Sequence, residues 1–380
     1  MANKSIQNQK LGILGGGQLG RMLIQSALDL NIDINVLDPD ENAPCKHISA
    51  EFTAGKLTDF DTVYKFGKSC DLLTIEIENV NTQALKKLQS EGKKVFPQPD
   101  VIELVQDKRT QKRFYKENNI PTADFVLTEN KEDVRKYTDR LPAVHKLGRE
   151  GYDGRGVQVI KDKEALDKAF DAPGVLEDLV NFKKEISVIV ARNENGEVKA
   201  FPVVELVFHP EANLVEYLFA PAGISERVAL EAERLAITVI NTLGMVGLLA
   251  VEMFVTHDDQ VLVNEIAPRP HNSGHQTIEA NYTSQYEQHL RSIFNMPLGD
   301  TSAVLPSAMV NLLGEDGYSG TAKYEGLEEV LGQKGVHVHL YGKKLTKPFR
   351  KMGHVTIVDE DVAVLRQKVD FVKNTLKVIA

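Results

Sequence analysis

The sequence has no tryptophan, only two cysteines and no long apolar run. Because Cys45 and Cys70 are isolated, they supply neither a disulfide framework nor a zinc cluster, which fits a reducing cytoplasm. No apolar run approaches the roughly 20 residues needed to span a bilayer, and the polar N-terminus lacks a signal-peptide pattern, so we expect no membrane association. Acidic residues outnumber basic residues, and the resulting net charge of −9 argues against a general nucleic-acid binder.

The length and composition are typical of a multidomain globular protein. A chain of 380 residues is too long for one ordinary core, so two or three domains are expected. Hydrophobic residues make up 42% and charged residues 26%, which is typical of globular proteins. Alternating strand and helix patterns predict an α/β fold at the N-terminus, followed by α+β regions.

A β-hairpin is predicted over residues 248–267, where two apolar β-branched runs flank the polar turn 257–260. Folding the hairpin at this turn places Glu252 beside Glu265, with Asn264 adjacent. Paired carboxylates among apolar residues are costly unless a cation lies between them. With the amide, they are hard oxygen ligands of the kind that Mg²⁺ prefers. The alternative is two solvated glutamates on an edge hairpin.

A glycine turn follows the first predicted strand and precedes a helix over 21–30. Gly15, Gly17 and Gly20 satisfy the dinucleotide-binding fingerprint, and Asp38 follows 18 residues after Gly20, where a ribose-binding acid is expected. A nicotinamide or flavin enzyme is therefore one interpretation. The turn could instead serve only close packing, or the helix N-terminus could hold another anion.

Two further strands end in residues suited to ligand binding. A strand over 71–80 carries Glu76 and Glu78 at its carboxyl end, which in a parallel sheet faces the ligand crevice. The strand 141–146 ends on Lys146, and the glycine-rich loop 151–156 follows it. Such a loop can close on a polyphosphate through its backbone N–H groups, although a plain mobile hairpin is the alternative.

The C-terminal eighty residues are predicted to contain short strands and one basic loop. Five cations lie within residues 343–351, in a chain that is acidic overall. One interpretation is a solvated loop. The other is a loop that binds a phosphate-bearing small substrate, since arginine can bind phosphate through two hydrogen bonds. A helix over 226–243 and a strand over 201–204 are also predicted.

From about residue 10 to about residue 360, the chain resembles the ATP-grasp superfamily, and most specifically the N5-carboxyaminoimidazole ribonucleotide synthetases. The resemblance rests on the runs Gly-Gly-Gly-Gln-Leu-Gly at 15–20, Gly-Tyr-Asp-Gly-Arg-Gly at 151–156 and Asn-Glu-Ile-Ala-Pro-Arg-Pro-His-Asn-Ser-Gly-His at 264–275. The last two runs are specific to that family and the first is not. Glu150 and Val157 depart from the family's usual glycine and glutamine.

The resemblance implies a fold of four parts and a set of site residues. The parts are a Rossmann-like domain at 1–108, a small ATP-grasp domain with the glycine-rich loop at 109–185, a large ATP-grasp domain with the metal hairpin at 186–305, and a small β-rich subdomain at 306–380. Catalytic roles are implied for Tyr152, Asp153, Arg269 and His271. ATP contacts are implied for Arg109, Lys146, Gly151, Tyr152, Asp153, Gly154, Arg155, Gly156, Glu177, Asp178, Leu179, Val180, Glu185, His209, Asn264 and Glu265. Contacts with the ribonucleotide are implied for Gly16, Gln18, Leu19, Glu76, Glu78, Arg155, Asn272, Lys344, Arg350 and Lys351, and Mg²⁺ ligation for Glu252 and Glu265.

The implied reaction is the ATP-dependent carboxylation of 5-aminoimidazole ribonucleotide by bicarbonate, through carboxyphosphate, in purine biosynthesis. A cytoplasmic homodimer is also implied. Three alternatives stay open: another ligase of the superfamily, such as a formate-using glycinamide ribonucleotide transformylase or a biotin carboxylase; a nicotinamide-dependent oxidoreductase; and a non-catalytic nucleotide sensor.

Overall fold

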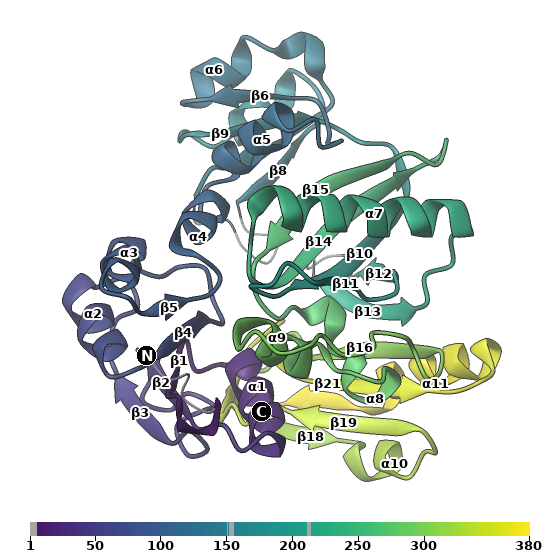
Figure 1. Cartoon of the computed structure of the whole chain (residues 1–380). Helices are drawn as coiled ribbons and strands as arrows, with labels where there is room; N and C mark the ends of the chain where they lie inside the picture. The colour runs from purple at the N-terminus through teal and green to yellow at the C-terminus, as the bar shows by residue number, and fades with distance from the viewer. Residues whose placement is uncertain (1–5, 150, 152–155, 211–213) are drawn as a thin grey trace.

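Three sheets follow one another along the chain in the computed structural model, which describes residues 6–149, 151, 156–210 and 214–380 (Figure 1). The first sheet is parallel, with strand order β3-β2-β1-β4-β5, as the βαβ pattern predicts. Its strands are β1 (Leu11–Leu14), β2 (Ile34–Asp38), β3 (Glu51–Ala54), β4 (Leu72–Ile75) and β5 (Lys94–Val95). The helices of this part are η1 (Ile6–Asn8), α1 (Gln18–Asp29), α2 (Phe60–Lys68), α3 (Thr82–Ser90) and α4 (Pro99–Val105).

A small antiparallel sheet forms the second layer, at the top of Figure 1. Its order is β6-β9-β7-β8, from β6 (Phe125–Thr128), β7 (Ala143–Leu147), β8 (Val157–Ile160) and β9 (Gly174–Asp178). The helices around it are α5 (Lys108–Glu117), α6 (Lys131–Arg135), η2 (Thr138–Arg140) and η3 (Glu164–Lys168). Asp107 begins α5 by accepting a hydrogen bond from the backbone N–H of Arg109, the capping that satisfies a free donor at a helix start.

The third sheet is the largest, with nine strands, and it is antiparallel. Its order is β15-β14-β10-β12-β13-β16-β21-β19, with β11 paired to β10. The strands are β10 (Phe182–Arg192), β11 (Val198–Ala200), β12 (Val204–Phe208), β13 (Val215–Ala220), β14 (Gly247–Thr256), β15 (Val261–Ala267), β16 (Ser307–Leu313), β19 (Val336–Leu340) and β21 (Lys351–Val358). The expected strand over 201–204 is wrong, because Phe201 to Val203 connect β11 to β12 without strand structure.

Helices pack against this sheet and bury its apolar residues. α7 (Glu226–Leu243) packs on β10 and β14, and its bounds match the predicted helix (Figure 1). The remaining helices are η4 (Asn272–Gly274), α8 (Thr277–Ala280), α9 (Gln285–Ile293), α10 (Leu327–Leu331) and α11 (Val362–Thr375). The sequence analysis missed α11, which packs on β16 and β21. Two ribbons complete the chain: β17 (Gly320–Thr321) with β20 (Leu345–Thr346), and β18 (Lys323–Glu325) with β22 (Lys377–Ile379).

The expected division into four parts stays a prediction, although the secondary structure bears on two of its boundaries. β10 runs without a break across the boundary at residue 185. β16 and β21 continue the large sheet beyond residue 306 through β13. Among the described residues, none of the helices combines the length and apolar character needed to cross a bilayer.

Candidate active site

Two glutamates face each other at the centre of the site. Glu252 on β14 and Glu265 on β15 are direct register partners, as the hairpin prediction required. Burial, together with the negative charges of Glu265 and Glu185, raises the pKa of Glu252 above its ordinary value. The positive charge of Lys108 instead lowers the pKa of Glu265. One carboxylate therefore already has a cation beside it, and the other does not favour its charged form without one.

Lys108 is a site residue that the sequence analysis missed. As the first residue of α5, it extends to Glu265 and forms an ion pair with it. Arg109, which was predicted to contact the ATP phosphates, has Nη2 2.8 Å from Asp107 Oδ2 and Nη1 3.5 Å from Glu129 Oε2. The expected contact of Arg109 with ATP stays a prediction, but Lys108 is the cation of this segment that reaches the carboxylates.

Lys146 lies at the end of β7, in the centre of a polar network. Its Nζ donates to Asn264 Oδ1 at 2.8 Å and lies 3.0 Å from Glu177 Oε2. A second lysine, Lys112, lies 3.3 Å from the other oxygen of Glu177. Burial alone would raise the pKa of Glu177, but the two lysines lower it below its ordinary value. Three predicted residues, Lys146, Glu177 and Asn264, are therefore brought together.

The ends of the glycine-rich loop lie close together. Gly156 has a φ of +75°, a conformation that favours glycine, and an added Cβ there would meet the Cα of Gly151 at 2.9 Å. The N–H of Leu147 donates to the carbonyl of Gly156 at 2.8 Å, so the loop leaves directly from β7 beside Lys146. The predicted residues Tyr152, Asp153, Gly154 and Arg155 lie outside the described part of the chain.

The connection between β9 and β10 holds the other predicted nucleotide contacts. Leu179 is exposed, Val180 is half-buried, and Asp178 forms an ion pair with Arg140 at 2.6 Å. Burial raises the pKa of Glu185, on β10, to about 7. His209 lies farther along the sheet, where its ring is 5.6 Å from that of Phe349.

The segment after β15 connects the glutamate pair to the first sheet. His271 Nε2 lies 3.5 Å from Glu252 Oε1, and its Nδ1 is 2.9 Å from Ser273 Oγ. Arg269 Nε lies 2.8 Å from Glu78 Oε1, beyond the end of β4. The predicted residues Arg269, His271 and Glu78 thus form a bridge from the hairpin to the parallel sheet. Asn272 differs, since its amide exchanges hydrogen bonds of 2.8 and 2.9 Å with Asn311.

The glycine turn is filled by the protein's own carboxylates. Glu76 accepts hydrogen bonds from the backbone N–H groups of Gly17 and Gly20, and Asp38 accepts one from Gly16 at 2.6 Å. Burial raises the pKa of Glu76, which these N–H donors oppose. Because Glu76 and Asp38, the expected ribose acid, accept hydrogen bonds from these N–H groups, the three groups are not free for a dinucleotide phosphate. The dinucleotide interpretation of the turn therefore does not fit, and the expected contacts of the turn with the ribonucleotide stay a prediction.

The other predicted ribonucleotide contacts lie around this turn and on the basic loop. Gln18 begins α1, and Leu19 is buried in the core of the first part. Lys344 Nζ reaches Asn42 Oδ1 at 3.3 Å, which brings the basic loop against the first sheet's domain. Arg350 donates to the carbonyl of Leu345 at 2.6 Å. The positive charge of Lys351 opposes the rise in the pKa of Glu252.

The donor set fits a magnesium ion shared with phosphate. The described residues hold no group of three or more His, Cys, Asp and Glu side chains arranged for a metal. Two facing carboxylates are nonetheless what Mg²⁺ uses when substrate phosphates and water supply its other oxygens. The raised pKa of Glu252 is the expected property of a carboxylate built to meet a cation.

Comparisons with known proteins agree with this geometry. Family models match residues 8–106 as a ribonucleotide synthetase preATP-grasp domain, residues 113–286 as an ATP-grasp domain and residues 307–368 as a phosphoribosylaminoimidazole carboxylase C-terminal domain. The N5-carboxyaminoimidazole ribonucleotide synthase of Bacillus subtilis is 36% identical over 357 residues, which cover 92% of this chain and 91% of that protein. The chain belongs to the N5-carboxyaminoimidazole ribonucleotide synthetase family.

Solved structures of this family superpose on nearly the whole chain. The Thermotoga maritima synthetase has a TM-score of 0.91 at 42% identity and covers 98% of this chain and 99% of its own. The Aspergillus clavatus synthase, solved with ADP and 5-aminoimidazole ribonucleotide, has a TM-score of 0.89 at 33% identity, covering 97% and 99%. The predicted ATP-grasp fold is confirmed, and the chain is an ATP-dependent ligase rather than an oxidoreductase.

Proposed function

We propose that this ligase carboxylates the exocyclic amine of 5-aminoimidazole ribonucleotide with bicarbonate, consuming ATP and releasing ADP and phosphate, as a step of purine biosynthesis. The contact of His271 with Glu252, at 3.5 Å, carries the proposal. It joins the carboxylates suited to metal-bound ATP directly to the family-specific run that faces the acceptor. Membership of the synthetase family supports the same reaction.

On the donor side, Glu252 and Glu265 would hold Mg²⁺ when ATP is bound. The ion would supply charge neutralisation at the phosphoryl group being transferred. Two lysines lie nearby: Lys108 pairs with Glu265, and Lys146 donates to Asn264, the residue before Glu265. We also assign ATP contacts to the other predicted residues: Arg109, Gly151, Gly154, Gly156, Glu177, Asp178, Leu179, Val180, Glu185, His209 and Asn264.

On the acceptor side, bicarbonate must first be activated because it is a poor electrophile. A bicarbonate oxygen takes the γ-phosphoryl group from ATP, which forms carboxyphosphate and leaves ADP. The amine then attacks the carboxyl carbon of carboxyphosphate, or CO₂ released from it, and phosphate leaves. Asp153 accepts the amine proton, while Tyr152, Arg269 and His271 orient the groups. Closure of the loop between Gly151 and Gly156 keeps water from this labile anhydride.

The ribonucleotide is proposed to lie between the glycine turn and the basic loop. Its contacts are Gly16, Gln18, Leu19, Glu76, Glu78, Arg155, Asn272, Lys344, Arg350 and Lys351. The hydrogen bond of Lys344 to Asn42 supports this location, because it brings cations of the basic loop beside the first domain. A homodimer is also proposed, and light scattering in solution tests it.

The test is ADP release measured with and without each co-substrate. Release should depend jointly on 5-aminoimidazole ribonucleotide and bicarbonate. Dependence on formate and glycinamide ribonucleotide, or on biotin, would instead identify another ligase of the superfamily, and slow turnover with every acid would identify a nucleotide sensor. In Asp153→Asn, carboxylation should fall relative to ATP consumption. Full carboxylation with normal coupling would show that Asp153 is not the proton acceptor.

A further inference from the structure

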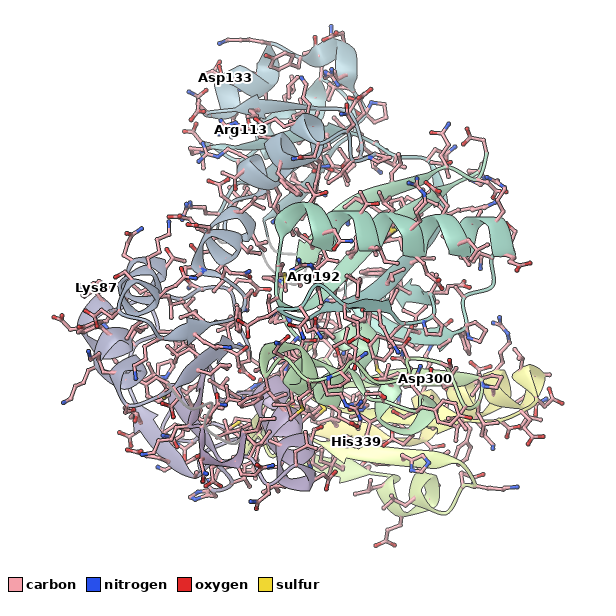
Figure 2. All side chains as sticks on the ribbon, viewed as in Figure 1. Lys87, Arg113, Asp133, Arg192, Asp300 and His339 are labelled. Carbon is pink, nitrogen blue, oxygen red and sulfur yellow. The ribbon has the colours of Figure 1, made fainter. Side chains whose placement is uncertain are left out.

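Lys112 is a buried cation that neither the family resemblance nor the proposed mechanism uses. It lies one turn after Lys108 on α5 and is 2% exposed, whereas the next residue, Arg113, is exposed (Figure 2). Burial lowers the pKa of Lys112 to about 8, and the nearby charge of Lys146 adds to this effect. Because burying a charged ammonium group without partners is energetically unfavourable, Lys112 requires charged or hydrogen-bonding partners of its own.

Two groups hold the Lys112 ammonium in one position, and one of them is anchored to β15. Its Nζ lies 3.3 Å from Glu177 Oε1 and donates to Thr122 Oγ1 at 2.6 Å. Thr122 Oγ1 in turn donates to the carbonyl of Val263 at 2.6 Å. Val263 immediately precedes Asn264 and Glu265 on β15, so Lys112 is anchored to the strand that carries the metal-site residues.

Glu177 connects Lys112 to Lys146. The carboxylate is 3% exposed, and its two oxygens each face one lysine, at 3.3 Å and 3.0 Å. Lys146 continues the network to Asn264 at 2.8 Å. A small cavity runs through the middle of these groups, and its lining is Lys108, Gln111, Lys112, Tyr115, Lys146, Glu177, Asn264 and Glu265.

We propose that Lys112 is a positioning residue for ATP: it shares the charge of Glu177, so that Lys146 stays available to the nucleotide phosphates. A buried carboxylate with a single cation holds that cation tightly, because neither charge has another partner. With Lys112 in place, the charge of Glu177 is also neutralised at Oε1, the oxygen that Lys146 does not contact. Lys146 can therefore divide its N–H donors between Glu177, Asn264 and a phosphate. This inference rests on the proposed use of ATP at this site.

The test compares Lys112→Met with Lys112→Arg, and with Lys116→Met as the control. Lys116 is an exposed lysine one turn later on the same helix. Calorimetric titration with MgADP should show affinity about 10-fold weaker for Lys112→Met, the scale of losing one charge-assisted contact. The KM for ATP should rise in parallel while the KM for the ribonucleotide stays within about twofold of wild type. Lys112→Arg should recover most of the lost affinity, and Lys116→Met should match wild type.

A second variant pair separates positioning from general destabilisation. If Lys112 acts through Glu177, the double variant Lys112→Met/Glu177→Gln should bind MgADP no more weakly than Glu177→Gln alone. It also removes both buried charges, so it serves as the folded test protein if Lys112→Met does not fold. Unchanged MgADP affinity in Lys112→Met, equal loss for both substrates, or additive losses in the double variant would each overturn the inference. Wild type that releases ADP without the ribonucleotide would instead overturn the proposed function.

Discussion

The ammonium of Lys108 lies against the carboxylate of Glu265, the register partner of Glu252 on the neighbouring strand. The side chain of Lys108 comes from the first residue of α5, far from β15 in sequence, and it places a cation where the donor phosphates of a metal-bound nucleotide are expected. The first prediction follows from this pairing and tests whether Lys108 contributes to nucleotide binding.

Lys108→Met is expected to raise the KM for ATP by about 10- to 100-fold, because a charge-assisted contact of about 1.5–3 kcal/mol is lost. Arg109→Met, the neighbouring substitution, should have the smaller effect, because Arg109 is turned towards Asp107 and Glu129. Steady-state kinetics at saturating ribonucleotide measure the KM for ATP of both variants. A larger effect for Arg109→Met would identify Arg109, and not Lys108, as the main phosphate-facing residue of this segment.

Glu265→Gln is expected to lower Mg²⁺-dependent ADP release by at least about 100-fold, the scale of losing several kcal/mol of charge stabilisation. The amide keeps the shape of the side chain but removes one of the two facing charges, so the fold should survive. Exposed Glu360 offers a matched control in Glu360→Gln, which should behave as wild type. Thermal unfolding of both variants checks the fold. Near-normal Mg²⁺-dependent turnover in Glu265→Gln would remove Glu265 from the metal site.

Arg269→Ala should lower kcat/KM for the ribonucleotide and leave the KM for ATP nearly unchanged. The physical reason is the ion pair of 2.8 Å between Arg269 and Glu78, which joins the hairpin segment to the first sheet beside the proposed ribonucleotide site. Combining Arg269→Ala with Glu78→Gln should give non-additive losses, with a coupling free energy of about 0.5–3 kcal/mol. Additive losses in this kinetic cycle would mean that the two residues act independently.

Stability is expected to fall as the pH is lowered from 7 to 5, partly through His289. Burial lowers the pKa of this imidazole to about 3, while its unfolded value is 6.5. Between these values the unfolded chain binds a proton that the folded protein does not, so stability is lost as pH falls below 6.5. For one such histidine the loss from pH 7 to 5 is about 2 kcal/mol.

Urea unfolding of His289→Gln measures this contribution. The variant loses the contact of 2.8 Å with Thr74 and should be less stable at pH 7, but its further loss at pH 5 should be about 2 kcal/mol smaller than that of wild type. The exposed His257 at the hairpin turn provides the control His257→Gln. An unchanged pH dependence in His289→Gln would show that the proton uptake occurs elsewhere.

Elements with strong local patterns were predicted well. The hairpin over 248–267 and the helix over 226–243 agree with β14, β15 and α7, because apolar periodicity and turn residues act over short distances. The C-terminal helix α11 was missed although its buried residues Leu365, Val369 and Val372 recur at helical spacing, because only short strands were expected in this part of the chain. The segment at 201–203 has β-branched and aromatic residues, yet it serves as a connection between strands.

Sequence motifs alone also determined the family and the facing of Glu252 and Glu265, because both depend on residues close together in the chain. Only the tertiary structure decided which cation meets Glu265, what fills the glycine turn, and how Lys112 reaches Lys146 through Glu177. Each of these contacts joins elements that are dozens of residues apart or more. Such pairings follow from the packing of α5 against β9 and β15, and of β4 against β1, and no local pattern of side chains encodes them.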